Sequence, residues 1–258
     1  MRTAVKGKRV IITAGAGGIG QAVIRQFVAA GAEVATCDIS EEGIERLRKE
    51  FPGIYSEVVD VGNAAMQTRF LESAIERFSG IDALVNNAGI SGPTARIEDV
   101  DISDWSNVFR VNVESHFVAC KVVVPHLRKQ RDGSVIFISS TAGRLGFALR
   151  TPYSASKWAL VGLMKSLAIE AGPEGVRVNA IMPGVVDGER IKRVIAAKAE
   201  AENLPYDEME RQWLKLVSLR RMIPPQEIAE MIQFLVSDAG RTISGQSLSL
   251  CGNQETLR

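Results

Sequence analysis

The feature that most constrains how this chain folds is a regular alternation of short apolar runs with longer segments of helical periodicity. The apolar runs have the length of buried strands, and the segments between them repeat apolar residues at helical spacing. Strands joined by crossover helices run in one direction and form a parallel sheet. The sequence therefore predicts an α/β fold with one doubly wound, seven-stranded parallel sheet. The expected strands are Arg9–Thr13, Glu33–Asp38, Tyr55–Asp60, Asp82–Asn86, Ser134–Ser139, Arg177–Ile181 and Ser247–Leu250. The expected helices span about Gly18–Ala30, Ala64–Phe78, Asp104–Lys129 and Tyr153–Ala171.

The length of 258 residues suits one large domain and is too short for two comfortable ones, so we expect a single domain over residues 1–258. One segment, 187–222, is charged, helical in propensity and longer than an ordinary connection. It follows Pro183 and Gly184 at the carboxyl end of an expected strand, where ligands bind in open α/β sheets. We interpret it as a helical substrate lid; a solvated helical excursion or an oligomer contact is the alternative.

Charge and composition exclude several classes of protein. The formal net charge is +1, from 31 basic and 30 acidic residues, which argues against nucleic acid or an anionic membrane as partner. Cys37, Cys120 and Cys251 are far apart in apolar stretches, and His116 and His126 belong to no ligand pattern, so we expect neither disulfides nor a metal. No signal peptide or membrane-spanning run is recognisable, and a cytoplasmic protein is expected.

A glycine-rich loop, Thr13-Ala14-Gly15-Ala16-Gly17-Gly18-Ile19-Gly20, follows the first expected strand and opens a helix. Glycines let backbone N–H groups approach a pyrophosphate, and the helix N-terminus favours its charge. The second strand ends in Asp38, at the spacing of an acidic residue that accepts hydrogen bonds from the adenosine ribose. Nucleotide binding is therefore expected, although Asp38 could instead cap the next helix.

Two further motifs come later in the chain. Asn86-Asn87-Ala88-Gly89 ends the fourth strand with small polar residues that suit either a turn or a close approach to ligand. Tyr153 and Lys157 are four positions apart, which on a helix places them on one face. A free phenol titrates near pH 10, and a nearby ammonium together with an oxidised nicotinamide ring would lower that pKa. The pair is therefore a candidate for proton transfer.

In this order and spacing, the motifs resemble those of the short-chain dehydrogenase/reductase family, in its single-domain branch of about this length. The resemblance runs from Lys8 to the last strand and implies a Rossmann-type fold. The matching elements are the glycine loop, Asp60-Val61, Asn86-Asn87-Ala88-Gly89, Asn112, Ser140, Tyr153, Lys157 and Pro183-Gly184.

The resemblance implies roles for four catalytic residues. Tyr153 is the general acid/base on the substrate oxygen, and Ser140 hydrogen-bonds the same oxygen, with Ser139 as the alternative serine. Lys157 binds the nicotinamide ribose and lowers the pKa of Tyr153. Asn112 supports a water that links Lys157 to solvent.

It also implies a cofactor site, in which hydride moves directly between the nicotinamide and the substrate carbon. Asp60 and Val61 flank the adenine, Asn87 to Gly89 line the nucleotide, and Pro183 to Val186 approach the nicotinamide. The full set of expected cofactor residues is Gly15, Gly17, Gly18, Ile19, Gly20, Asp38, Ile39, Asp60, Val61, Asn87, Ala88, Gly89, Tyr153, Lys157, Pro183, Gly184 and Val186.

Three positions depart from the family pattern. Ala14 stands where a glycine is usual, so we expect ordinary turn backbone with negative φ there. Gly188 stands where a threonine often bonds the nicotinamide carboxamide, so another group must take that role. Leu250-Cys251-Gly252-Asn253 replaces a more usual Val-Asp-Gly-Gly.

The expected cofactor is NAD, because Asp38 would face the 2′-phosphate of NADP and no basic residue stands at Gly17, Ile39 or Ser40. For the substrate site the candidates are Ser140 with Arg144, Arg150 and Arg190. They suggest a polar or anionic hydroxy compound such as a sugar acid, polyol or hydroxy acid.

Other interpretations stay open. They are an NADPH-dependent 3-oxoacyl reductase and a catalytically silent NAD-binding sensor. An S-adenosylmethionine methyltransferase would have no use for Ser140, Tyr153 and Lys157 in register. A homotetramer is expected, from the family and from two helices, around 113–124 and 159–168, that are too apolar to leave in water.

Overall fold

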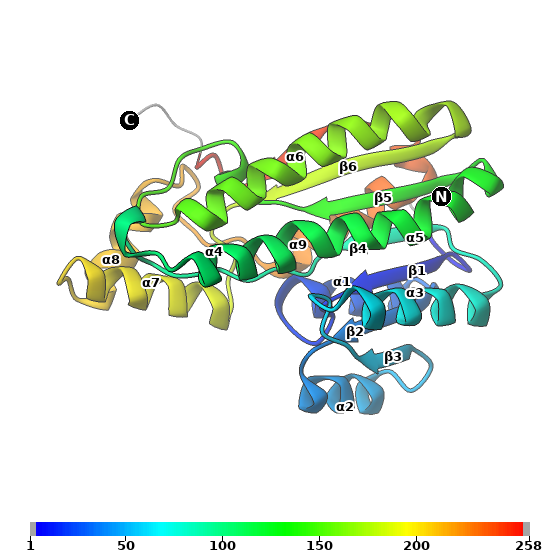
Figure 1. Ribbon diagram of the computed structural model, residues 1–258, viewed down its shortest axis with the longest axis horizontal. Coiled ribbons are helices and arrows are strands. Elements are labelled where there is room, and N and C mark those ends of the chain that lie inside the picture. Colours follow the sequence, from blue (N-terminus) through cyan, green and yellow to red (C-terminus); the bar gives the residue numbers. More distant parts are fainter. Residues whose placement is uncertain (1–3, 255–258) are drawn as a thin grey trace.

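All seven expected strands form, and every pairing between neighbouring strands is parallel. The computed structural model describes residues 4–254 and orders the strands β3-β2-β1-β4-β5-β6-β7 (Figure 1). The strands are β1 Arg9–Thr13, β2 Glu33–Asp38, β3 Tyr55–Val58, β4 Ala83–Asn86, β5 Gly133–Ile138, β6 Val176–Pro183 and β7 Ser247–Leu250. The doubly wound parallel sheet expected from the sequence is confirmed.

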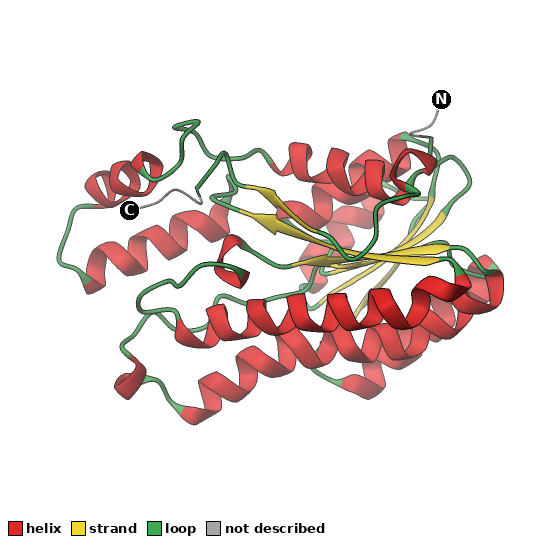
Figure 2. Cartoon of the chain, turned by 90° about the horizontal axis from the view of Figure 1, so that it is seen from above, coloured by secondary structure: helices red, strands yellow, loops and turns green. Residues whose placement is uncertain are grey.

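Helices lie on both sides of the sheet, as Figure 2 shows. They are α1 Gly18–Ala29, α2 Glu41–Glu50, α3 Ala64–Phe78, α4 Ile102–Phe109, α5 Ser115–Gln130, α6 Thr151–Ala171, α7 Glu189–Ala201, α8 Tyr206–Lys215 and α9 Pro225–Val236. The sequence analysis assigned neither α2 nor α9. Within residues 4–254, no helix is both long and apolar enough to cross a bilayer.

Alternate strand residues face the two helix layers, since side chains alternate between the faces of a strand. Ile11, Leu84 and Phe137 join one buried cluster with residues of α3, α5 and α6. Ile12 and Ile136 join a second cluster with residues of α1, α2 and α9. This sandwich holds the carboxyl ends of β1, β4, β5 and β6 side by side at one edge of the sheet.

The expected helix over Asp104–Lys129 forms, but a π-helical turn, Arg110–Glu114, separates α4 from α5. Asn112 lies in this wider turn and is completely buried. Such π turns recur at functional sites. Here the turn contains Asn112, a predicted site residue.

The segment after β6 contains α7 and α8, which lie beyond the sheet at the left of Figure 1. Ile195, Ala199 and Met209 form a small apolar cluster between these helices. The helices expected in this segment are therefore present. Its role as a lid is a prediction.

Candidate active site

The glycine loop lies at the carboxyl end of β1, next to the point where strand order reverses between β1 and β4. The N-cap of α1 is Gly17, so no side chain caps the first N–H groups, and the first turn contains no acidic residue. A Cβ added to Gly17 or Gly18 would meet no atom within 4 Å. The helix end therefore presents N–H groups to open space, an arrangement that suits a pyrophosphate.

Ala14 adopts the left-handed conformation with φ +54°, so the expectation of ordinary turn backbone was wrong. Left-handed backbone costs an L-residue about 1–2 kcal/mol. Contacts from a distant strand hold it in place, because Asn87 Nδ2 donates to the carbonyls of Thr13 and Ala14 at 3.0 and 2.8 Å. A Cβ on Gly20 would lie only 2.3 Å from the Ala14 oxygen, so the close packing of this loop requires glycine there.

The Asn87–Gly89 segment is tied to its neighbours by two residues that the sequence analysis did not select. Thr13 Oγ1 accepts the backbone N–H groups of Asn87 and Ala88 at 3.0 and 3.1 Å. His116 Nε2 lies 2.8 Å from the Ala88 oxygen, and burial lowers the pKa of the imidazole to about 3. A neutral His116 therefore donates to Ala88. The position of Thr13 at the end of the first expected strand could have indicated a site residue. No sequence pattern around His116 indicates this role.

Asp38 occupies the end of β2 beside the glycine loop. Its two carboxylate oxygens accept the backbone N–H groups of Ala16 at 2.9 Å and Ser40 at 3.0 Å. The N-cap of α2 is Ser40, whose hydroxyl accepts from Gly43 N at 3.0 Å. Asp38 is therefore not the helix cap. Ile39 beside it is 70% exposed.

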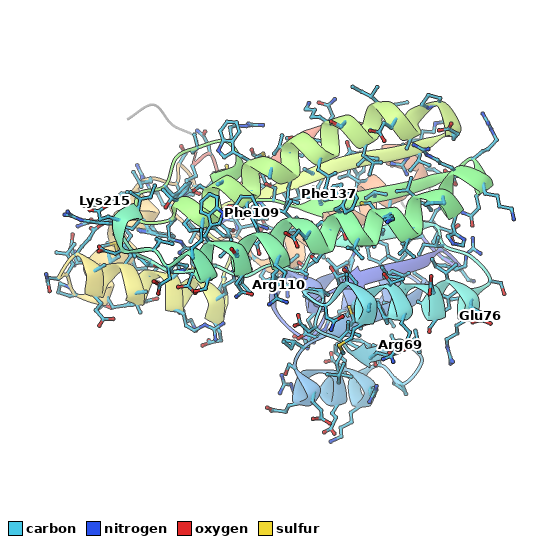
Figure 3. All side chains as sticks on the ribbon, in the orientation of Figure 1. Arg69, Glu76, Phe109, Arg110, Phe137 and Lys215 are labelled. Carbon is cyan, nitrogen blue, oxygen red and sulfur yellow. The ribbon has the colours of Figure 1, made fainter. Side chains whose placement is uncertain are left out.

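Asp60 and Val61 follow β3 on the same edge of the sheet. Asp60 accepts the N–H of Gly62 at 2.8 Å and pairs with Arg110 at 3.5 Å. Arg110, labelled in Figure 3, lies in the π turn that also carries Asn112. The sequence analysis missed this ion pair, which joins the expected adenine side to the turn.

The catalytic candidates converge on the phenol of Tyr153. Lys157 lies one turn further along α6, with Nζ 5.7 Å from the Tyr153 ring centre and donating to the Ile138 oxygen at 2.9 Å. The Ser140 hydroxyl lies near enough to the Tyr153 phenol to lower its pKa. Ser139 instead donates its hydroxyl to the Lys157 carbonyl at 2.9 Å. The geometry favours Ser140 over Ser139 as the serine that faces a substrate oxygen.

Electrostatics around Tyr153 favour its ionised form. Burial raises the pKa of the phenol, but the charges of Lys157, Arg190 and Arg150, with the hydrogen bond to Ser140, outweigh burial and leave the pKa below its ordinary value. Burial lowers the pKa of the Lys157 ammonium to about 8; Tyr153 opposes this change and Arg190 adds to it. The site therefore combines an acidified phenol with a cation beside it.

Asn112 is held in place by its neighbours. Its Oδ1 accepts the Ile90 N–H at 2.8 Å, and its Nδ2 donates to the Ile90 oxygen and to Ser156 Oγ, each at 3.0 Å. A Cβ on Gly89 would lie 3.3 Å from Asn112 Oδ1 and 3.4 Å from Lys157 Nζ. Asn112 and Lys157 thus both border Gly89, while the water relay between them stays a prediction. Ser156, next to Lys157 in the sequence, was not predicted.

Two of the three arginines expected to contact substrate lie at Tyr153. The guanidinium carbons of Arg150 and Arg190 are 5.0 and 5.8 Å from the centre of its ring. Arg144 lies elsewhere, with Nη2 donating to the Ser247 oxygen at 3.2 Å. Arg150 comes from the loop before α6, whereas Arg190 comes from the first turn of α7.

The segment after β6 explains one departure from the family pattern. Pro183 ends β6, and a Cβ on Gly184 would lie 2.8 Å from Cys251 Cα, so these two strand ends pack closely. Val186 pairs with Ile223 in an isolated parallel bridge. Gly188 has φ +141° and ψ 174°, a conformation essentially restricted to glycine. A threonine there would need a different backbone.

Among the described residues, no group of three or more His, Cys, Asp and Glu side chains could hold a metal ion. All three cysteines are buried and free.

Comparison with known proteins adds to this geometry. Residues 8–199 match the short chain dehydrogenase family. The 3-oxoacyl-acyl-carrier-protein reductase FabG of Thermotoga maritima is 33% identical over 252 residues, which cover 96% of this chain and 98% of that protein. The structures of levodione reductase and of NAD⁺-bound xylitol dehydrogenase are 28% and 27% identical, each with a TM-score of 0.91 over 96% of this chain and 98% of theirs. The chain therefore belongs to the short-chain dehydrogenase family, a family of oxidoreductases that bind a nicotinamide cofactor.

Proposed function

We propose that this protein is an NAD-dependent dehydrogenase that interconverts a secondary alcohol and a ketone, and that its substrate is a polar or anionic hydroxy compound. The observation that carries the proposal is the phenol of Tyr153, which has Lys157 Nζ 5.7 Å from its ring centre and a pKa lowered by nearby cations and by Ser140. A general base works best when its pKa approaches the working pH. An ordinary tyrosine does not meet this condition, and Tyr153 comes closer to it.

The residues then divide the chemistry as follows. In oxidation, the Tyr153 phenolate takes the proton of the substrate hydroxyl, and Ser140 donates a hydrogen bond to the same oxygen. The carbon loses its hydrogen with two electrons, and the nicotinamide, when bound, supplies the acceptor of that hydride. Lys157 stabilises the phenolate by its charge. In reduction, the Tyr153 phenol returns the proton to the carbonyl oxygen.

The described residues fit a dinucleotide. The N-terminus of α1 lacks a side-chain cap and faces open space. At the other end of the site, Gly89 presents bare backbone beside Lys157 and Asn112. We infer that the glycine loop holds the pyrophosphate, that Asp60 and Val61 flank the adenine, and that Lys157 binds the nicotinamide ribose.

Asp38 supports NAD over NADP. Both of its oxygens are anchored by backbone N–H groups, so the carboxylate cannot swing away from a ligand. Within residues 4–254, no lysine or arginine forms an ion pair with Asp38. A 2′-phosphate at this position would meet an uncompensated negative charge. The ribose hydroxyls of NAD would instead donate hydrogen bonds to it.

The main competing function is NADPH-dependent reduction of a 3-oxoacyl group, which the likeness to FabG favours. The likeness to xylitol dehydrogenase favours a hydroxy compound instead. The two arginines at Tyr153 also suit a charged or strongly polar substrate better than an acyl chain.

Assembly and location are part of the proposal. Trp105, Phe117 and Trp158, on α4, α5 and α6, are exposed although large and apolar. They support a homotetramer, in which such surfaces would be covered. A cytoplasmic location is also proposed.

A substrate screen tests the proposed function. Sugar acids, polyols, hydroxy acids and steroids are supplied with NAD or NADP, and NADH or NADPH formation is followed by absorbance; NADPH oxidation is followed with an acetoacetyl thioester. We expect NAD-dependent turnover of a polar hydroxy compound. Turnover only of the thioester with NADPH would identify a 3-oxoacyl reductase instead, and NADH binding without any turnover would identify a sensor.

A further inference from the structure

Arg150 is a buried cation without a counter-ion among the described residues. Its exposed fraction is 9%, and no aspartate or glutamate in residues 4–254 forms an ion pair with it. One terminal nitrogen, Nη2, donates to the Ser91 carbonyl at 2.8 Å. Its Nε is buried and has no hydrogen-bond partner. Buried charges in proteins are ordinarily paired, so this arrangement needs an explanation.

The stacking of Arg150 on Tyr153 does not supply the missing partner. The guanidinium carbon lies over the phenol ring, 5.0 Å from its centre, and the ring supplies no carboxylate to pair with the charge. The N–H groups of arginine point outward in the plane of the guanidinium, where they match both oxygens of a carboxylate. The structure shows no hydrogen bond from the other terminal nitrogen, Nη1, to any described residue, and Nη1 is not among the buried atoms without a partner, so Nη1 is the group that can meet an anion.

A second cation approaches the same ring from the segment after β6. Arg190 lies 5.8 Å from the Tyr153 ring centre, and its Nη1 donates to the Gly89 carbonyl at 3.0 Å. Arg190 is exposed and lies in the first turn of α7, two residues after Gly188. Burial lowers the pKa of Arg150, and the positive charge of Arg190 lowers it further. An anion bound between the two guanidinium groups would relieve this repulsion.

We propose that Arg150 and Arg190 form a carboxylate-binding subsite, and that the substrate is a short hydroxy acid. This inference rests on the proposed function, because it places the reacting hydroxyl at Tyr153 and Ser140. Arg150 touches the tyrosine ring, and a charge-assisted hydrogen bond spans about 2.8 Å. Because both guanidinium carbons lie within 5.8 Å of the Tyr153 ring centre, one small molecule can place a hydroxyl at the phenol and a carboxylate at the guanidinium groups.

Arg150 has the fixed position of an anchor, since it is buried and bonded to Ser91. Arg190 contributes from α7, so binding of the anion links that helix to the site. A neutral polyol would leave both guanidinium groups without a counter-ion. The subsite therefore selects hydroxy acids over polyols of the same length.

The test uses binding and not turnover. Malonate and its neutral diamide, malonamide, are titrated calorimetrically into wild type, Arg150→Met, Arg190→Ala and the control Arg211→Ala. The control removes an exposed arginine of α8 that pairs with Glu208. A lost charge-assisted contact corresponds to about 10- to 100-fold in affinity. We expect malonate to bind wild type and the control alike, Arg150→Met and Arg190→Ala to weaken it by that factor, and malonamide to bind none of them measurably.

Equal malonate affinity in Arg150→Met, Arg190→Ala and the control overturns the subsite, and so does equal binding of malonate and malonamide by wild type. If Arg150→Met does not fold, as judged by circular dichroism, Arg150→Lys and Arg190→Ala decide the question: weakened malonate binding in both supports the subsite, and unchanged binding overturns it. Failure of the proposed function gives a different pattern, in which malonate binds through Arg150 but no hydroxy compound is oxidised. Turnover of polyols with no binding of malonate overturns the subsite alone.

Discussion

Replacing Asp38 and Ile39 together should change the preference of the protein from NAD toward NADP. The perturbation is Asp38→Asn with Ile39→Arg. Asparagine keeps an acceptor oxygen for one of the N–H groups of Ala16 and Ser40 that Asp38 now holds, while it removes the charge. Ile39 is 70% exposed, so an arginine side chain at this position has room to reach a 2′-phosphate. The double variant should therefore fold and differ mainly in electrostatics.

The magnitude follows from charge and distance. Two unit charges of the same sign 4 Å apart repel by about 1 kcal/mol in water and about 4 kcal/mol at the effective dielectric constant near a protein surface. The wild type should accordingly prefer NAD by about one to three orders of magnitude in kcat/KM. Removing the aspartate should abolish this penalty, and the added arginine should contribute a charge-assisted contact to the phosphate.

The assay compares kcat/KM for NAD and NADP with one hydroxy compound that the wild type oxidises. Asp38→Asn alone should move the ratio part of the way, and the double variant should move it further. Melting temperatures measured without cofactor show whether the loop survives the change. A wild type that prefers NADP would refute the reasoning, as would a folded double variant with an unchanged ratio, because Asp38 would then serve only to hold the loop.

Two further predictions concern the phenol and the loop. Tyr153 should be the first of the three tyrosines to ionise as pH rises, because cations lower its pKa while burial raises the pKa of Tyr55 and of Tyr206, each next to a glutamate. In a pH titration followed by phenolate absorbance, the first step should therefore disappear in Tyr153→Phe. Persistence of that step in the variant would contradict the electrostatic account. Gly20→Ala should lower the free energy of unfolding by about 1–3 kcal/mol, because the added methyl meets a backbone oxygen at 2.3 Å. The added methyl of Gly17→Ala meets open space, so this control should have the melting temperature of the wild type in thermal melts without cofactor. Equal melting temperatures of the two variants would count against the tight packing of the loop.

Much of the fold could be predicted because the central strands β1, β4, β5 and β6 are mainly apolar runs buried on both faces. The β5 residues Gly133–Ile138 are all buried, and their sequence is correspondingly apolar. Helix α2 was missed because only Ile44 and Leu47 carry its apolar face, with Gly43 as its third buried residue. Helix α9 was missed although two prolines mark its start, at Pro224 and Pro225.

Parts of the site depended on contacts between distant residues and could not be predicted. The left-handed Ala14 is held by Asn87, which follows β4 and is distant in the sequence, so no local rule of backbone preference includes this contact. Arg144 and Arg150 were equivalent candidates in one loop. The structure buries Arg150 against Tyr153 and directs Arg144 to Ser247. Their difference arises from tertiary packing, which sequence spacing does not contain.

The central claim is that Tyr153 transfers the proton while the rest of the site binds the cofactor. The most direct measurement is kcat of Tyr153→Phe for NAD-dependent oxidation of a hydroxy compound, together with the Kd for NADH from fluorescence. General acid/base catalysis contributes about 10²–10⁴-fold, so turnover should fall by at least about 100-fold while the Kd changes only slightly. A variant that keeps about a tenth of the wild-type kcat, with NADH binding unchanged, would show that another group moves the proton.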